Sequence, residues 1–173
     1  MKEKMENLRR PLTKDDLELR VDRITEKGFS VFLYKTARTD ARRLDDVFGI
    51  NWQRKHYIDS KQNVVCGISI YNEETKEWIT REDVGTEGFA EKEKSAYSDA
   101  FKRAGFAWGI GRELYELPFI FIKAETEKME KGYKLKNSFY VQELTIAKYE
   151  YKEGAFKIEI GHRKGEKVEV FIK

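Results

Sequence analysis

The chain has 173 residues, of which 40% are hydrophobic and 38% are charged, and its formal net charge is only +3. Because this balance excludes a uniformly basic nucleic-acid-binding surface, any cationic site has to come from local clustering. A single cysteine excludes an internal disulfide framework, and no apolar run approaches the roughly 18 residues of a membrane span, so we expect a soluble cytoplasmic protein without a membrane partner.

The N-terminal segments are predicted first as an arm, then as a helix and a strand. Residues 1–12 are polar and of mixed charge, so we expect a flexible N-terminal arm. Thr13 followed by Asp16 has the pattern of a capping box, which predicts a helix that ends at Gly28. A short, apolar, β-prone run over 29–34 then predicts a strand.

A second helix is predicted from Thr39 to Gly49, and it lies in a locally basic stretch. Between positions 35 and 55 there are three acidic residues and six basic ones: Lys35, Arg38, Arg42, Arg43, Arg54 and Lys55. These cations either line a binding surface or form ordinary surface ion pairs, such as Arg42 with Asp45 or Asp46. Such pairs contribute only a few tenths of a kcal/mol. The residues alone leave both interpretations open.

The remaining segments are mostly β. Strands are predicted over residues 52–57, 64–71, 77–84, 117–122, 139–149, 155–160 and 168–172. The Lys/Glu-rich stretch 123–137 is predicted as a linker or a long hairpin loop. This order of elements predicts an α+β domain, with a core over 13–122 and a C-terminal β extension of the same domain over 123–173.

A long amphipathic helix over 91–115 organises the chain. Apolar residues recur on one face at helical spacing. The opposite face carries spaced cations: Lys94, Lys102 and Arg103. Gly109 and Gly111 allow the helix to end sharply, which re-aims Arg112. Such a helix is either a wall of an anion-binding groove or an ordinary surface helix with a solvated charged face.

The residues indicate no catalytic site. His56 and His162 lie far apart, and neither has a cysteine or acidic partner at ligand spacing. The sequence GIGR lacks the pattern of a phosphate-binding loop. We therefore expect no enzyme, no metal and no cofactor. Cationic helices beside aromatic strands suit a groove that holds a phosphate backbone while bases stack.

Three stretches carry a resemblance to a known family: ARTDARRLDDVFGINW at 37–52, EDVG at 82–85 and KEKSAYSDAFKRAGFAWGIGRELY at 92–115. With the hairpin VVCGISIYNEETKEWITREDVG, they resemble the Rad fifty-two superfamily of single-strand annealing proteins. Within this superfamily, the motifs most resemble those of the short Sak-type phage recombinases and of the bacterial DdrA branch. The ordered match covers about residues 15–122.

The resemblance implies a β-β-β-α core, in which a curled antiparallel sheet packs on the long helix, and a ring or filament of identical subunits. Single-stranded DNA would lie in a basic groove with its bases exposed. The family's DNA-contacting Lys-Arg pair falls on Lys102 and Arg103, a further lysine on Lys94, and a helical arginine on one of three candidates: Arg38, Arg42 or Arg43. Arg112 and Lys35 complete the candidate set. Because the stretch 86–93 is short, the resemblance leaves open whether the protein has a second DNA site.

The implied function is ATP-independent annealing of complementary single strands during recombination and repair in a bacterial or phage-infected cell. The alternative is a protein that binds and protects DNA 3′ ends without annealing them. A metal-dependent nuclease and a ring-forming scaffold without a DNA role stay open as further classes. A single-strand binding protein or an exonuclease is a candidate protein partner.

Overall fold

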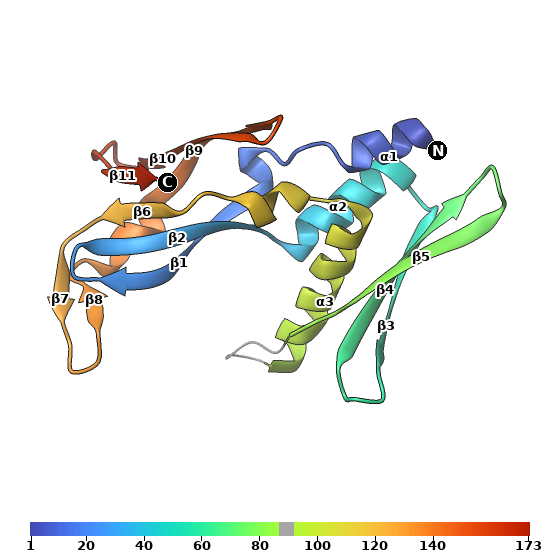
Figure 1. The fold of residues 1–173 in the computed structure, drawn as a ribbon, viewed down its shortest axis with the longest axis horizontal. Coiled ribbons are helices and arrows are strands. Elements are labelled where there is room, and N and C mark those ends of the chain that lie inside the picture. The colour runs from blue at the N-terminus through green and yellow to red at the C-terminus, as the bar shows by residue number, and fades with distance from the viewer. Residues whose placement is uncertain (87–91) are drawn as a thin grey trace. The chain divides into compact units, whose positions relative to one another are not determined.

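The structure is a computed structural model that describes residues 1–86 and 92–173, and within them all side chains except those at 92–94, 138 and 139. Its helices are α1 (Lys2–Leu8), α2 (Ala37–Phe48), α3 (Lys92–Trp108) and the 3-10 turns η1 (Lys14–Asp16), η2 (Arg112–Glu116) and η3 (Ser138–Glu143). Its strands are β1 (Leu17–Thr25), β2 (Gly28–Lys35), β3 (Trp52–Ile58), β4 (Val64–Asn72), β5 (Glu77–Val84), β6 (Ile120–Lys123), β7 (Thr126–Lys128), β8 (Tyr133–Leu135), β9 (Leu144–Lys152), β10 (Ala155–His162) and β11 (Val170–Ile172). Helices and antiparallel sheets together confirm the α+β class (Figure 1).

The chain folds into two compact units. Unit 1 comprises residues 1–11 and 35–112, and unit 2 comprises residues 12–34 and 113–173. Each unit therefore combines segments that are distant in sequence, and the division into a core over 13–122 and an extension over 123–173 stays a prediction. None of the described helices is both long and apolar enough to span a bilayer.

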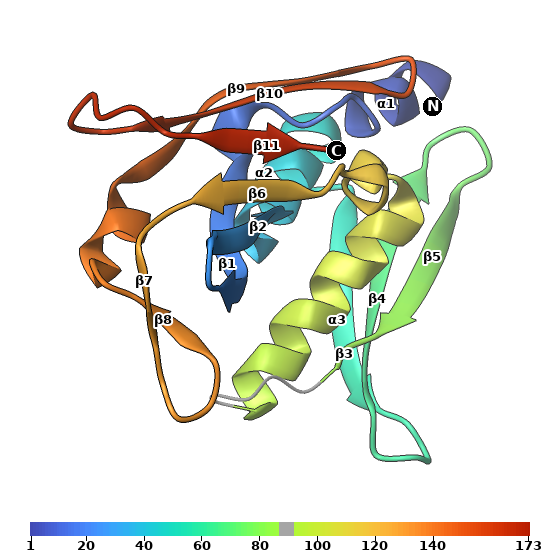
Figure 2. The same cartoon turned by 60° about the vertical axis from the view of Figure 1, so that its left-hand side comes forward.

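Unit 1 is built on an antiparallel meander in the order β3-β4-β5, which α3 crosses (Figure 2). The central strand β4 is buried along most of its length, and its Ile68 carbonyl accepts a 2.9 Å hydrogen bond from the Trp108 indole of α3. Ala96, Ala100 and Ala104 form the facing stripe of α3, where small side chains let helix and sheet approach closely. The three strands predicted here are confirmed, and so is the amphipathic helix, although it ends at Trp108 and not at 115.

The N-terminal residues differ from the predicted flexible arm. Residues 2–8 form α1, which packs against α2 and buries Leu8 completely. Met1 and Met5 are partly buried beside Leu8 in the same core. These three residues are spaced one and two helical turns apart, which indicates a helix. The prediction of a flexible arm rested on the mixed charge of the segment and did not use this spacing.

In unit 2, the helix predicted over 13–28 is wrong beyond its first turn. The capping box between Thr13 and Asp16 is present, but it opens only the single turn η1. The following residues, LELRVD, alternate apolar and polar positions and form β1. Their period of two, together with pairing in the four-stranded sheet β1-β2-β6-β11, overrides the local helix-start signal.

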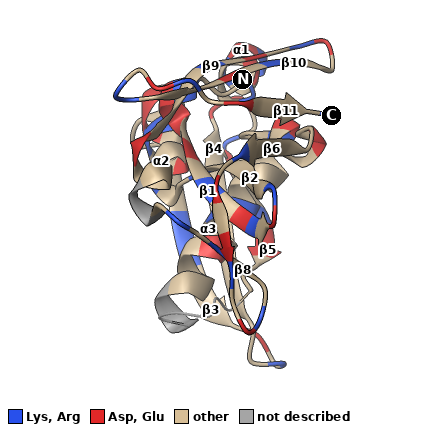
Figure 3. Ribbon diagram, turned by 90° about the vertical axis from the view of Figure 1, so that its left-hand side faces the viewer, with Lys and Arg blue, Asp and Glu red and all other residues tan. Residues whose placement is uncertain are grey.

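The rest of unit 2 confirms the predicted strands with adjusted bounds. Residues 138–143 form η3, so β9 begins at Leu144, and β9 pairs with β10. The Lys/Glu-rich stretch 123–137 contains the hairpin β7–β8, which carries both basic and acidic residues (Figure 3). Its charges pair across the strands, Lys134 with Glu127 at 3.2 Å and Lys136 with Glu125 at 3.1 Å.

Candidate nucleic-acid interface

Lys102 and Arg103 are consecutive residues of α3, and one carboxylate, that of Asp99, contacts the cationic groups of both. Arg103 Nε donates to Asp99 Oδ2 at 2.9 Å, and Lys102 Nζ lies 3.8 Å from Asp99 Oδ1. The side chains of Lys102 and Arg103 are 27% and 39% exposed, so both remain accessible to an anion in solution. The predicted pair therefore forms one oriented, partly exposed cationic site in unit 1.

Asp99 is held as an anion by Thr86, the second residue after β5. Its Oδ2 accepts hydrogen bonds from the backbone N–H and the hydroxyl of Thr86, both at 2.9 Å. Burial raises the pKa of Asp99, but the hydrogen bonds from Thr86 and Arg103 outweigh it and leave the pKa below the usual range. Sequence reasoning missed Asp99, although it precedes Lys102 and Arg103 by three and four residues, the spacing of helical ion pairs.

Lys35 belongs beneath this surface and not on it. The Lys35 ammonium is buried, pairs with the Asp40 carboxylate and donates to the carbonyl oxygen of Lys102 at 3.2 Å. It also lies 4.0 Å from the centre of the Phe106 ring. We therefore remove Lys35 from the candidate contacts, since a cation enclosed by its own protein is not available to a strand.

The three candidate arginines of α2 separate into two groups. Arg43 is buried, and its guanidinium donates to the carbonyl oxygens of Arg10 and Pro11, so it fixes the chain after α1 and is also removed from the candidate contacts. Arg38 and Arg42 are exposed on α2 and stay in the candidate set.

The bounds of α2 differ from the predicted ones at the start only. The helix begins at Ala37, directly after Thr36, and not at Thr39. It ends before Gly49, whose φ of 57° fits the predicted terminator.

The helix α3 ends at Trp108, directly before the two glycines as predicted, and Arg112 is exposed just beyond this end. Its Nε donates to the carbonyl oxygen of Phe106 and its Nη2 to that of Ala107, both at 2.8 Å. Arg81 of β5 donates to the same Ala107 oxygen at 2.6 Å. Sequence reasoning did not single out Arg81, because its position in a polar strand carried no sign that it reaches a helix end.

Two predictions fall outside the described residues. Lys94 belongs to α3, but its side chain is not among those described, so its role stays a prediction. Most of the stretch 86–93, on which a second DNA site depended, also lies outside them. Within the described part of the chain, no group of three or more His, Cys, Asp or Glu side chains could hold a metal ion.

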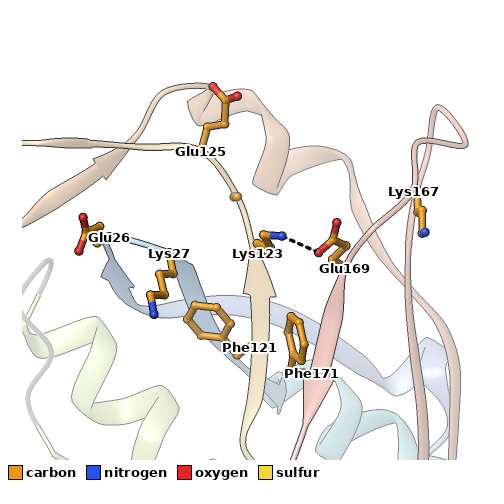
Figure 4. A pocket seen from close by; sticks show the side chains of 9 residues that line it. Glu26, Lys27, Phe121, Lys123, Glu125, Lys167, Glu169 and Phe171 are labelled. Atoms are coloured by element: carbon orange, nitrogen blue, oxygen red, sulfur yellow. Dashed lines mark hydrogen bonds and ion pairs between the residues drawn. The ribbon is translucent and has the colours of Figure 1, made fainter.

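Unit 2 contains a pocket of about 680 Å³ that we do not assign to the interface (Figure 4). Three lysines and three glutamates line it together with the rings of Phe121 and Phe171. Lys123 Nζ lies 3.0 Å from Glu169 Oε2, which the dashed line in Figure 4 marks. Because its positive and negative charges balance, this pocket offers no excess attraction for a polyanion.

Comparison with known proteins agrees with the family suggested by the motifs. Residues 1–133 match the family described as Rad52/22 family double-strand break repair protein. The chain is 39% identical over 88 residues to the single-stranded DNA-binding protein DdrA of Deinococcus radiodurans, a match that covers 47% of this chain and 41% of that relative. No solved structure matches the chain. The chain therefore belongs to the Rad52/22 family of double-strand break repair proteins.

Proposed function

We propose that this protein binds single-stranded DNA and anneals complementary strands without a nucleotide cofactor. The observation that carries the proposal is the joint presentation of Lys102 and Arg103 by Asp99 on the accessible face of α3. Family membership and the DNA-binding relative support the same ligand. Annealing requires a held backbone and free base edges, and neither requirement calls for a nucleophile or a metal.

We propose further that identical subunits assemble side by side into a ring or filament, which repeats this modest site along one strand. In the three-stranded sheet of unit 1, β3 and β5 are the outer strands. Large apolar side chains on them are exposed: Tyr57, Ile58, Trp78, Ile79 and Val84. Outer strands with apolar surface favour pairing with another chain. Repetition of one weak site would raise the overall affinity by avidity.

The alternative is a protein that binds single strands or their 3′ ends without annealing them. It is favoured by the printed name of the DdrA relative, which states single-stranded DNA binding only. Mixing two complementary labelled oligonucleotides with the wild-type protein separates the two functions. Acceleration of duplex formation at saturating protein supports annealing, whereas binding without acceleration supports the alternative.

Replacing Lys102 and Arg103 together by alanine is expected to weaken single-strand binding at least tenfold at low salt and to abolish annealing. The slope of log affinity against log salt should become shallower by roughly 1.4, because each lost phosphate contact contributes about 0.7. Fluorescence anisotropy with a labelled oligonucleotide at several salt concentrations measures both quantities. The matched control, Lys134→Ala with Lys136→Ala, removes the same charge from the β7–β8 hairpin and should leave the slope unchanged. Equal slopes for both double variants would remove the assignment.

Asp99→Asn should tighten single-strand binding at low salt severalfold, because Lys102 and Arg103 then lose the internal anion that competes with phosphate. Asparagine retains an acceptor for Thr86, so the free energy of unfolding should fall by only about 1 kcal/mol. Anisotropy and thermal unfolding measure the two effects. Weaker binding by a folded Asp99→Asn variant would instead show that the orientation imposed by Asp99 outweighs its charge.

A further inference from the structure

A third arginine joins Arg81 and Arg112 at the C-terminal end of α3. Arg9, which follows α1, points its Nε at the carbonyl oxygen of Trp108 from 3.4 Å. Its side chain crosses Gly109, whose φ is +104° and where a Cβ would lie 2.7 Å from Arg9 Cγ. A side chain at this position would therefore displace Arg9. We refer to Arg9, Arg81 and Arg112 as the arginine cluster.

The arginine cluster has more hydrogen-bond donors than the end of α3 uses. Three guanidinium groups carry about fifteen N–H donors, and the helix carbonyls take four of them. Arg81 and Arg112 each place a nitrogen within 2.8 Å of the same Ala107 oxygen, which brings their guanidinium groups side by side. The Arg81 guanidinium is further fixed over the Trp108 ring at 4.7 Å. Oriented donors therefore remain available to a further acceptor.

The charge of the arginine cluster is also unbalanced. Over the described residues, no carboxylate lies within ion-pair distance of Arg9, Arg81 or Arg112. The end of a helix contributes only about half a negative charge. Lys102 and Arg103, by contrast, share the full charge of Asp99. Because Arg9 and Arg112 are exposed, an anion from solution can reach the cluster.

The arginine cluster continues the side of α3 that presents Arg103. Asp99, Arg103 and Ala107 are spaced four residues apart and therefore lie on one stripe of the helix. The Ala107 carbonyl, which both Arg81 and Arg112 contact, lies about 6 Å further along the axis than the equivalent position of Arg103. A strand held at Arg103 and directed along this stripe would reach the cluster next.

We propose that the arginine cluster is a second anion site, which binds a phosphate group of the nucleic acid beyond the one held by Lys102 and Arg103. This inference rests on the proposed function for the identity of its ligand. Arginine suits the role because its planar fork can donate two parallel hydrogen bonds to one phosphate, whereas lysine acts as a point charge. Both a backbone phosphodiester and a terminal phosphate offer this chemistry.

The test compares Arg112→Gln, Arg112→Lys and Arg9→Gln with the wild-type protein and with Arg20→Gln, an exposed charge in β1. Anisotropy is measured over a series of salt concentrations with oligothymidine that carries or lacks a 5′ phosphate. We expect Arg112→Gln to weaken binding severalfold and to reduce the salt slope by about 0.7. Arg112→Lys should retain the slope but lose affinity, and Arg20→Gln should change neither. A loss seen with both oligonucleotides indicates a backbone phosphate, and a loss confined to the phosphorylated one indicates a terminal phosphate.

The same variants separate binding from helix capping. If Arg112→Gln and Arg9→Gln lower the melting temperature but leave affinity and slope at wild-type values, the cluster only caps α3 and the inference is overturned. If the wild-type protein binds no oligonucleotide, the proposed function fails instead. The cluster is then tested with inorganic phosphate by NMR of the arginine Nε–H signals. Shifts that Arg112→Gln abolishes support an anion site, and unshifted signals refute it.

Discussion

Asp40→Ala is expected to lower the free energy of unfolding by about 3–5 kcal/mol, because it leaves the Lys35 ammonium buried without its counter-ion. The side chains of Lys35 and Asp40 are 1% and 0% exposed, so water does not replace the lost partner. Gly105 of α3 packs directly on the pair, since a Cβ there would lie 2.7 Å from Asp40 Oδ1. The pair thus joins the start of α2 to the turn of α3 that carries Lys102.

The control for this prediction replaces both members, Lys35→Met with Asp40→Leu. Apolar side chains of similar volume remove the buried charges together, so the free energy of unfolding should stay near the wild-type value or rise. Urea unfolding of the two variants measures the difference. A mild effect of Asp40→Ala, within about 1 kcal/mol of the double variant, would contradict the burial of a charged pair.

The ion pair also predicts a pH dependence of stability. Burial lowers the pKa of Lys35 to about 8 despite Asp40, and burial raises the pKa of Asp40 to about 6 despite Lys35. Lys102 and Arg43 add positive charge nearby and lower both pKa values. Asp40 stabilises the fold below its ordinary pKa of 3.8, and this contribution is lost as the pH rises to about 6. The contribution of Lys35 is present above its ordinary pKa of 10.5 and is lost as the pH falls to about 8.

Relative to the Lys35→Met, Asp40→Leu variant, the wild-type protein should therefore be least stable between about pH 6 and pH 8. Its relative stability should increase on either side of this window. Chemical unfolding of both proteins from pH 5 to pH 9 would establish the difference. A flat difference across this range would show that the two groups titrate normally in the folded protein.

Periodicity predicted the elements that carry their own amphipathic signal. The helix that became α3 and the strands β3, β4 and β5 follow from the spacing of apolar residues. The prediction failed at β1, where a real capping box was extended into a helix although the next residues alternate. The division into two units was not predictable in this way, because Lys35 and Leu12 mark boundaries set by tertiary packing.

The candidate site was predictable only as a list of charges. Sequence placed Lys102 and Arg103 on one helix, but burial separates Lys35 and Arg43 from the accessible residues. That distinction depends on which acceptors surround each cation in the folded protein, such as the Asp40 carboxylate beside Lys35. The acceptor groups of the arginine cluster are backbone carbonyls, which no side-chain pattern reveals.

Gly85→Ala is expected to destabilise the protein and weaken DNA binding together, because the glycine of the EDVG motif lies directly against α3. A Cβ at this position would lie 2.1 Å from the carbonyl oxygen of Ala96 and 2.7 Å from the backbone N of Ala100. Overpacking costs about 1–3 kcal/mol where side chains can adjust, and since backbone has to move here we expect about 3 kcal/mol. The same movement carries away Thr86, whose two hydrogen bonds hold Asp99.

Gly161→Ala is the matched control, since a Cβ there would meet its nearest atoms at an ordinary 3.4 Å. Urea unfolding should therefore separate the two alanine variants clearly, and anisotropy at low salt should show weaker binding for Gly85→Ala alone. The affinity of the folded Gly85→Ala protein is the decisive measurement, because it tests whether the spacing between β5 and α3 sets the orientation of Lys102 and Arg103. If that affinity equals the wild-type value, Asp99 does not need Thr86 to present the two cations. The glycine would then serve the packing of unit 1 and nothing beyond it.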